Sequence, residues 1–417
     1  MMRMTALDGL RGWFLITMTL SHVVLQQGVW LDWLHFRNLM FVESAQGFVF
    51  LSGLLFGMVQ YRRLIKQGPQ ALWQSAGRRV LELWCWAVGL LILVLMARNH
   101  LPNGAWIYRN WLGQSGLEDP IRVAAIATTI FQPTFMDILP QYMIYIAVAP
   151  AVLLLVRREL WPLAAALSII VWMSAQLGLV LPLSRGVDLL AEARDGQGLR
   201  MAFDPMGWQL LFMGGVIVGS LWQRGTLRAE HLFPAGPAWP LAALAVMLFF
   251  LPLRVLTAHG WLDPQTLGLF AQMERRSNLG PVYVMNFVAA AWLMGWLLHR
   301  GAEAAPVIQR IAAGLRRLVG WEWAALLGRH SLQTYVWHVV LVYALRYADA
   351  AHGPLGPVQA TLGVAVALLL LPLPACLLEG RFIRRPVAPA RQEPRLSAQD
   401  LPTITPSVRQ PPVMRRP

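Results

Sequence analysis

A histidine and an arginine share one face of the first apolar segment. The segment reads LDGLRGWFLITMTLSHVV (residues 7 to 24), in which Arg11 and His22 are 11 positions apart. At about 100° per residue, a helix brings them back to within roughly 20° of each other, about 16 Å apart along its axis. Histidine exchanges protons near neutral pH and arginine binds anions. The pair predicts a proton-transfer site at His22 and an anion site at Arg11.

The sequence alone also allows simpler roles for these side chains. Asp8 lies one turn before Arg11, so these two residues are also a suitable ion pair for anchoring a helix end at an interface. His22 is equally able to form a hydrogen bond between helices. An ionisable side chain in a lipid environment is costly, so in every case this stripe is expected to face the protein interior or a wet cavity.

Polar side chains in other apolar segments extend the candidate site. Glu43 is the third residue of the stretch FVESAQGFVFLSG (41 to 53), and we expect it to orient or charge-balance His22. The stretch LGRHSLQTYVWHVV (327 to 340) carries His338 into another apolar segment. Candidates for aligning an acceptor or stabilising an oxyanion are His338 and four outer residues, namely Asp137, Gln141, Asp204 and Asn286. Polar groups thus gather toward one end of the segments and cationic groups toward the other.

The composition identifies the elements that must position these residues. Of the 417 residues, 57% are hydrophobic and only 13% are charged, which is far from the balance of a soluble domain. Crossing a bilayer takes about 20 mostly apolar residues. Ten such stretches occur, at 10–29, 41–61, 80–97, 138–156, 161–181, 206–222, 239–256, 281–298, 332–347 and 355–378. We therefore expect an all-α polytopic membrane protein of about ten transmembrane helices.

The positions of the basic residues predict the orientation of these helices. The net charge is +14, but most of the Lys and Arg residues fall in the connections on one side of the predicted membrane and in the C-terminal region. This asymmetry is typical of a bacterial inner-membrane protein with both termini in the cytoplasm. A nucleic-acid partner is not needed to explain the charge. Cys85 and Cys376 are isolated, and no metal site is expected.

The cytoplasmic side holds two further features. Residues 305–320 place apolar side chains at helical spacing opposite Arg310, Arg316 and Arg317, which predicts a helix on the membrane surface. We expect a membrane domain over residues 1–385. Residues 386–417 are rich in Pro and Arg, which is typical of a disordered tail.

The motifs resemble those of a known enzyme family. LDGLRG followed by His22, then ESAQGFVFLSG, then LGRHSLQTYVWH look like the motifs of the acyltransferase-3 superfamily of ten-helix membrane enzymes. The chain from about Met4 to Arg385 looks more closely like OpgC, the branch that succinylates osmoregulated periplasmic glucans. Within this resemblance, His22, Arg11 and Glu43 match the family's histidine, inner arginine and acidic residue. Arg78 and Arg79 stand where the superfamily has paired arginines, without the usual RxxR spacing.

The resemblance implies that an acyl group passes from a donor at the cytoplasmic end of the site to an acceptor at the periplasmic end. His22 is the expected general base for a glucan hydroxyl on the periplasmic side. The phosphates of a cytosolic acyl-CoA donor, succinyl-CoA or acetyl-CoA, would bind the arginines of the inner rim, which are Arg11, Arg62, Arg63, Arg78 and Arg79. Two alternatives stay open: an O-acetyltransferase of another periplasmic or surface glycan, and a proton-coupled transporter of small anions.

Overall fold

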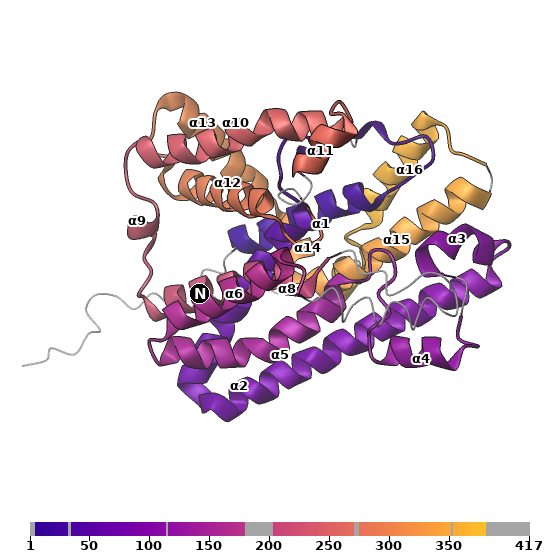
Figure 1. Ribbon diagram of the computed structural model, residues 1–417, viewed down its shortest axis with the longest axis horizontal. Helices are drawn as coiled ribbons and strands as arrows, with labels where there is room; N and C mark the ends of the chain where they lie inside the picture. The colour runs from indigo at the N-terminus through magenta and orange to yellow at the C-terminus, as the bar shows by residue number, and fades with distance from the viewer. Residues whose placement is uncertain are drawn as a thin grey trace, which may run out of the picture.

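The computed structural model describes residues 5–31, 35–113, 116–179, 203–270, 275–351 and 353–380. Within these ranges all regular secondary structure is helical, which confirms the all-α prediction (Figure 1). The predicted tail of residues 386–417 lies outside the described residues.

The helix that carries Arg11 and His22 is shorter than predicted. Helix α1 runs from Thr5 to His22, whereas the sequence predicted helix from Leu10 to Val29. The prediction was wrong at the outer end because a turn interrupts the apolar run, with Gly28 at φ 73° and its N–H bonded to the carbonyl of Leu25. Glycine adopts this left-handed conformation without a steric penalty. His22 is therefore the last residue of its helix, at the edge of a loop.

One long helix forms the second and third predicted segments. Helix α2 runs from Ser44 to His100 with a sharp break at Gly68, which has φ 82° and ψ 177°. Pro69 follows directly, and a proline lacks the N–H that would continue the helix. Gly68 and Pro69 thus divide α2 into two arms that meet at one end of the molecule, as the lower left of Figure 1 shows.

The other predicted segments also form helices. The seven that match them are α5 (Ile138–Arg157), α6 (Trp161–Gln176), α8 (Pro205–Arg224), α10 (Ala238–Ala258), α12 (Pro281–Arg300), α15 (Ser331–Ala351), and α16 (Pro357–Leu370) with α17 (Leu373–Leu378). Shorter helices are η2 (Phe36–Asn38), α3 (Gly104–Leu112), α4 (Pro120–Ala127), α9 (Ala229–Leu232), α11 (Pro264–Phe270), α13 (Pro306–Val319) and α14 (Glu322–Arg329). Several begin with proline at their first turn, where no intrahelical N–H bond is lost.

The described helices make this a multi-pass membrane protein. Six of them are long and apolar enough to cross a bilayer: α2, α5, α8, α10, α12, and α16 together with α17. Helix α2 accounts for two of the ten predicted crossings. The count of ten crossings and the cytoplasmic position of both termini stay predictions.

Several short helices lie at two opposite ends of the molecule. Helices α3 and α4 are at the right of Figure 1, while α9, α13 and the break in α2 are at the left. The left end contains the basic connections that the sequence assigns to the cytoplasm. The helix predicted at 305–320 is present as α13, with Arg310, Arg316 and Arg317 exposed, and its position on the membrane surface stays a prediction.

Helix α1 is held in the interior by a very close contact with α14. At Gly12 a side-chain carbon would overlap the backbone carbonyl of Ala324, and at Gly328 it would overlap that of Asp8. Glycine at such positions lets two helix backbones approach each other, as is common between membrane helices. The Trp13 indole N–H also donates to the carbonyl of Leu318, at 2.7 Å. These contacts set the position of α1, and with it the positions of Arg11 and His22.

Candidate functional site

The structure joins His22 of α1 to His338 of α15. Nδ1 of His22 lies 3.0 Å from Nε2 of His338. The His22 ring is partly exposed and stacks on Phe135, with ring centroids 4.2 Å apart, whereas the His338 side chain is fully buried. The sequence predicted both histidines as site residues but not their contact.

The loop before α5 holds this histidine pair in place. Phe135 has φ 69°, a conformation rare for an aromatic residue. Its carbonyl accepts a hydrogen bond of 2.7 Å from the hydroxyl of Tyr335, which is one turn before His338 on α15. Backbone outliers of this kind concentrate at functional sites. The strained residue here is the one that stacks on His22.

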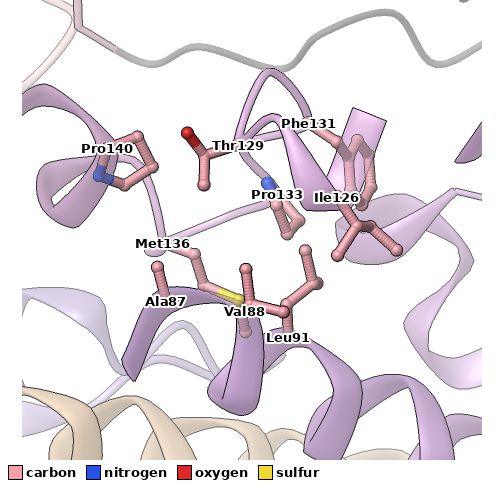
Figure 2. A pocket seen from close by; sticks show the side chains of 9 residues that line it. All are labelled: Ala87, Val88, Leu91, Ile126, Thr129, Phe131, Pro133, Met136 and Pro140. Atoms are coloured by element: carbon pink, nitrogen blue, oxygen red, sulfur yellow. The ribbon is translucent and has the colours of Figure 1, made fainter. Parts of the chain in front are cut away.

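A small apolar cavity lies beneath the same loop. It measures about 10 Å³ and is lined by α2, α4 and residues 129–140, including Val88, Ile126 and Met136 (Figure 2). A volume this small holds at most about one water molecule. It has no room for a substrate, and these side chains therefore serve to pack the Phe135 loop against α2.

The hydrogen bonds of His338 determine which nitrogen of His22 carries the free lone pair. Nδ1 of His338 contacts the backbone carbonyl of Tyr335, an acceptor, so in the neutral ring Nδ1 carries the proton. Nε2 of His338 is then an acceptor, and Nδ1 of His22 must donate to it. This arrangement leaves the lone pair of His22 on Nε2. His338 thus fixes the neutral His22 ring in the form whose Nε2 is able to accept a proton.

At the other end of α1, Arg11 opens into a cleft of about 430 Å³. Its Nη2 donates to the hydroxyl of Ser331 at 2.5 Å, and its guanidinium lies over the ring of Phe48 at 5.5 Å. Arg78 and Arg79 line the same cleft from the second arm of α2, together with the polar side chains of Gln60 and Ser75. The remaining lining is mainly apolar and comes from α2, α5 and α8.

Three of the five predicted donor-binding arginines therefore share one cleft. Arg79 also pairs with Glu82, at 2.7 Å. Arg63 does not line the cleft, but it bonds to Gln60 and Ser75, which do. Arg62 is exposed and is not among the lining residues. The structure thus brings Arg11, Arg78 and Arg79 together and leaves Arg62 apart from them.

A polar stripe on α15 connects the cleft to the histidine pair. Ser331 bonds to Arg11 and His338 bonds to His22, and Thr334 lies between them at helical spacing. Thr334 is fully buried, and its hydroxyl oxygen makes no hydrogen bond within the described residues. Sequence reasoning missed Ser331 and Thr334, although Thr334 is four residues and Ser331 seven residues before His338, a spacing that marks the same helix face.

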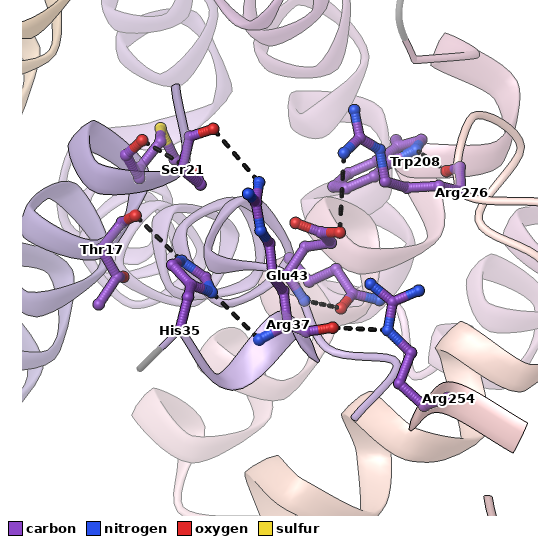
Figure 3. Close-up of polar contacts among 10 residues, drawn as sticks. Thr17, Ser21, His35, Arg37, Glu43, Trp208, Arg254 and Arg276 are labelled. Atoms are coloured by element: carbon purple, nitrogen blue, oxygen red, sulfur yellow. Dashed lines mark hydrogen bonds and ion pairs between the residues drawn. The ribbon is translucent and has the colours of Figure 1, made fainter. Parts of the chain in front are cut away.

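Glu43 takes a different role from the predicted one. It caps the start of α2, and its carboxylate lies 3.7 Å from Nη1 of Arg276 (Figure 3). His22, which we expected Glu43 to orient or charge-balance, is bonded through Nδ1 to His338. The expected pairing of Glu43 with His22 is therefore not what the structure shows. Sequence spacing could not identify Arg276, because it lies more than 200 residues from Glu43.

A comparison with known protein families matches this chain over nearly its whole length. The family model described as OpgC protein matches residues 3–381. The chain belongs to the OpgC family. Membership of this family implies an acyltransferase-like function on periplasmic glucans. No curated protein and no solved structure gives a significant match to the chain.

The four outer candidates of this OpgC-family protein make mostly structural contacts. Asp204 caps α8 by accepting from the N–H groups of Met206 and Gly207. Gln141 donates to the carbonyl of Phe203 at 3.0 Å. Asp137 is buried at the start of α5, two residues after Phe135. These contacts favour helix capping and loop attachment for Asp204 and Gln141.

Asn286 is the fourth outer candidate and differs from the others. It is fully buried on α12 and donates from Nδ2 to the carbonyl of Val282 at 3.0 Å. Its Oδ1 atom has no hydrogen-bond partner within the described residues. Nothing in the described contacts connects Asn286 to His22. Across the described part of the chain, no cluster of three or more His, Cys, Asp or Glu side chains is placed to hold a metal ion.

Proposed function

We propose that this protein transfers an acyl group, succinyl in the first instance, from cytosolic acyl-CoA to hydroxyl groups of a periplasmic glucan in the bacterial inner membrane. The single observation that supports this most is the hydrogen-bonded pair of His22 and His338. The pair lies at one end of α1, and the arginine-lined cleft lies at the other. Membership of the OpgC family favours this reaction over ion-coupled transport.

The cleft at Arg11 suits the donor. Acyl-CoA carries several phosphate charges, and guanidinium groups bind phosphate oxygens with two parallel hydrogen bonds. Arg11, Arg78 and Arg79 supply three such groups around a cleft whose volume is within the usual range for small-molecule sites. The apolar lining is suited to the uncharged arm that carries the thioester.

The proposed chemistry uses Nε2 of His22 as the base. This nitrogen removes the proton of a glucan hydroxyl while the hydroxyl oxygen attacks the thioester carbonyl carbon. The resulting tetrahedral intermediate collapses, the carbon–sulfur bond breaks, and the thiolate of CoA takes the proton back from the imidazolium. Products are the glucan ester and the free CoA thiol. A positioned general base of this kind contributes about 10² to 10⁴-fold to the rate.

Purified protein in detergent provides the test. The protein is incubated with succinyl-CoA or acetyl-CoA and a periplasmic glucan, and the mass added to the glucan identifies the acyl group. We expect ester formation that falls to background in His22→Ala, because the variant lacks the base proposed to take the hydroxyl proton. Normal turnover by a folded His22→Ala variant contradicts the proposal. If the purified protein forms no ester with either donor, the proposed function is wrong.

A further inference from the structure

Helix α3 has an exposed face that carries one tryptophan among polar residues. The exposed residues of this helix are Ala105, Trp106, Arg109 and Asn110, and Trp106 is 61% exposed. Their spacing of three and four residues places Trp106, Arg109 and Asn110 side by side on the helix surface. Helix α3 lies at the right of Figure 1, at the opposite end of the molecule from the basic connections. The face is therefore expected on the periplasmic side.

The composition of this face indicates contact with water instead of lipid. It has no aliphatic side chain larger than alanine, and Arg109 is exposed within it. The exposed surface of α10, a candidate membrane span, is by contrast formed by large apolar side chains such as Leu248 and Phe249. An indole ring on a water-facing polar surface is a large apolar area without a protein partner. Trp106 thus has the properties of a ligand contact.

Arg109 limits the orientation of the Trp106 ring. The guanidinium carbon of Arg109 lies 4.8 Å from the ring centroid, which is within the range of a cation–π interaction. Apart from this contact, Arg109 has no hydrogen-bond or ion-pair partner among the described residues. The ring is therefore oriented while most of its surface stays accessible, and the guanidinium N–H groups beside it are available to a ligand.

A sugar unit has the chemistry that fits this surface. The faces of a glucopyranose ring carry C–H bonds, and its hydroxyl groups lie around the edge. The C–H face packs against an indole ring as an apolar surface. The hydroxyl oxygens at the edge accept hydrogen bonds from a neighbouring guanidinium. A lipid acyl chain, in contrast, would contact the ring but would leave the N–H groups of Arg109 without an acceptor.

Helix α3 also lies close to the histidine pair. The Tyr108 hydroxyl donates to the backbone carbonyl of Tyr343 on α15, at 2.8 Å. The Trp111 ring lies edge-on to Phe135, with centroids 5.3 Å apart, and Phe135 stacks on His22. These contacts fix the exposed face of α3 relative to the proposed base.

The exposed face and the base are separate positions for a sugar. Trp106 is five residues before Trp111, which is about 7.5 Å along the helix axis. The rings of Trp111 and Phe135 follow one another between Trp106 and His22. A sugar unit that stacks on Trp106 is therefore a different unit from the one that reacts at His22.

We propose that Trp106 and Arg109 form a subsite that binds one sugar unit of the glucan while another unit of the same chain is acylated at His22. The inference rests on the proposed function, since it requires a carbohydrate acceptor. The subsite contributes affinity for a polymeric acceptor and does not touch the reacting atoms. An acceptor of one sugar unit cannot occupy both positions, so its reaction does not depend on the subsite.

The test compares acceptors of two lengths. The acceptors are periplasmic glucan and methyl glucoside, a single sugar unit, each measured with a saturating acyl-CoA donor. In Trp106→Ala we expect the KM for glucan to rise about 10-fold or more with kcat unchanged, while kcat/KM for methyl glucoside stays at the parent value. Arg109→Gln should raise the KM for glucan about 2- to 5-fold, because it removes the cation beside the ring.

Trp261→Ala is the matched control, because Trp261 is 67% exposed in the loop after α10, which is also predicted to lie on the periplasmic side. It should leave both acceptors unaffected. Titration calorimetry of glucan into the protein without donor gives the Kd of each variant, which should follow the KM. Size-exclusion chromatography verifies that each variant is folded, and if Trp106→Ala fails to fold, Arg109→Gln decides the question alone.

The outcomes separate the subsite from the proposed reaction. An equal loss with both acceptors in Trp106→Ala overturns the inference, because it assigns the ring a structural role. An unchanged KM and Kd for glucan overturn it as well, and make Trp106 an interfacial residue. Glucan binding that is weakened in Trp106→Ala, in a parent protein that forms no ester, supports the subsite and overturns the proposed reaction. A parent protein that neither binds glucan nor forms an ester overturns both.

Discussion

His338 is predicted to control catalysis without touching the substrate. Its Nε2 atom, 3.0 Å from Nδ1 of His22, is the acceptor that keeps the His22 proton away from Nε2. In His338→Leu this acceptor is lost, and an N–H left without a partner at this half-buried position costs about 1 to 3 kcal/mol. Since each 1.36 kcal/mol changes a rate tenfold, we expect kcat to fall by about 10- to 100-fold.

His338→Gln is the matched comparison for this substitution. The glutamine amide oxygen extends about as far as Nε2 of the imidazole and accepts a hydrogen bond, so it should restore most of the rate. Both variants lose the contact of His338 with the carbonyl of Tyr335. Initial rates of transfer from labelled acyl-CoA to glucan, measured over a range of donor concentrations, separate kcat from KM. The donor KM should stay close to that of the parent, because the cleft is at the other end of α1.

Two results would refute this reasoning. If the folded leucine variant keeps the parent kcat, the hydrogen bond between the histidines has no role in proton transfer. If leucine and glutamine reduce kcat equally, the loss comes from packing around α15 and not from the missing acceptor.

Three further predictions follow from other contacts. Arg11→Gln should raise the KM for acyl-CoA about 10-fold or more with a smaller effect on kcat, measured by the same initial rates, because it removes one phosphate partner. Gly12→Leu should abolish folded protein in detergent, since α1 and α14 have no space for a side chain there, whereas Gly77→Leu, at an open position, should not. Asp204→Ala should lower stability by about 1 kcal/mol through loss of a helix cap, with unchanged acceptor KM; a raised KM would instead support substrate binding.

The sequence predicted most of the helices, because each one is a long apolar run with polar breaks. It also predicted the separation of Arg11 and His22 on one face of α1, which depends only on helix geometry. The helix of residues 305–320 followed from its amphipathic spacing and is present as α13. The outer end of α1 was predicted wrongly, since the apolar composition continues through the turn at Gly28.

Only the tertiary structure decided which of these residues meet. His22 and His338 are 316 positions apart, and the charged partner of Glu43 is Arg276 instead of a neighbour in sequence. Ser331 and His338 lie on one face of α15, and they contact Arg11 and His22 on one face of α1. Only the tertiary structure shows that these two helix faces lie against each other.

The physical reason lies in the membrane itself. An apolar helix face has similar favourable contacts with lipid and with another helix, so composition identifies a crossing segment but not its neighbours. The neighbours are chosen by close backbone approach at glycines such as Gly12 and Gly328, and by a few buried hydrogen bonds. By itself, the sequence therefore determined the helices and the chemistry available on each face. The packing of α1 against α14 and α15 decided that His22 meets His338 and that Arg11 meets Ser331.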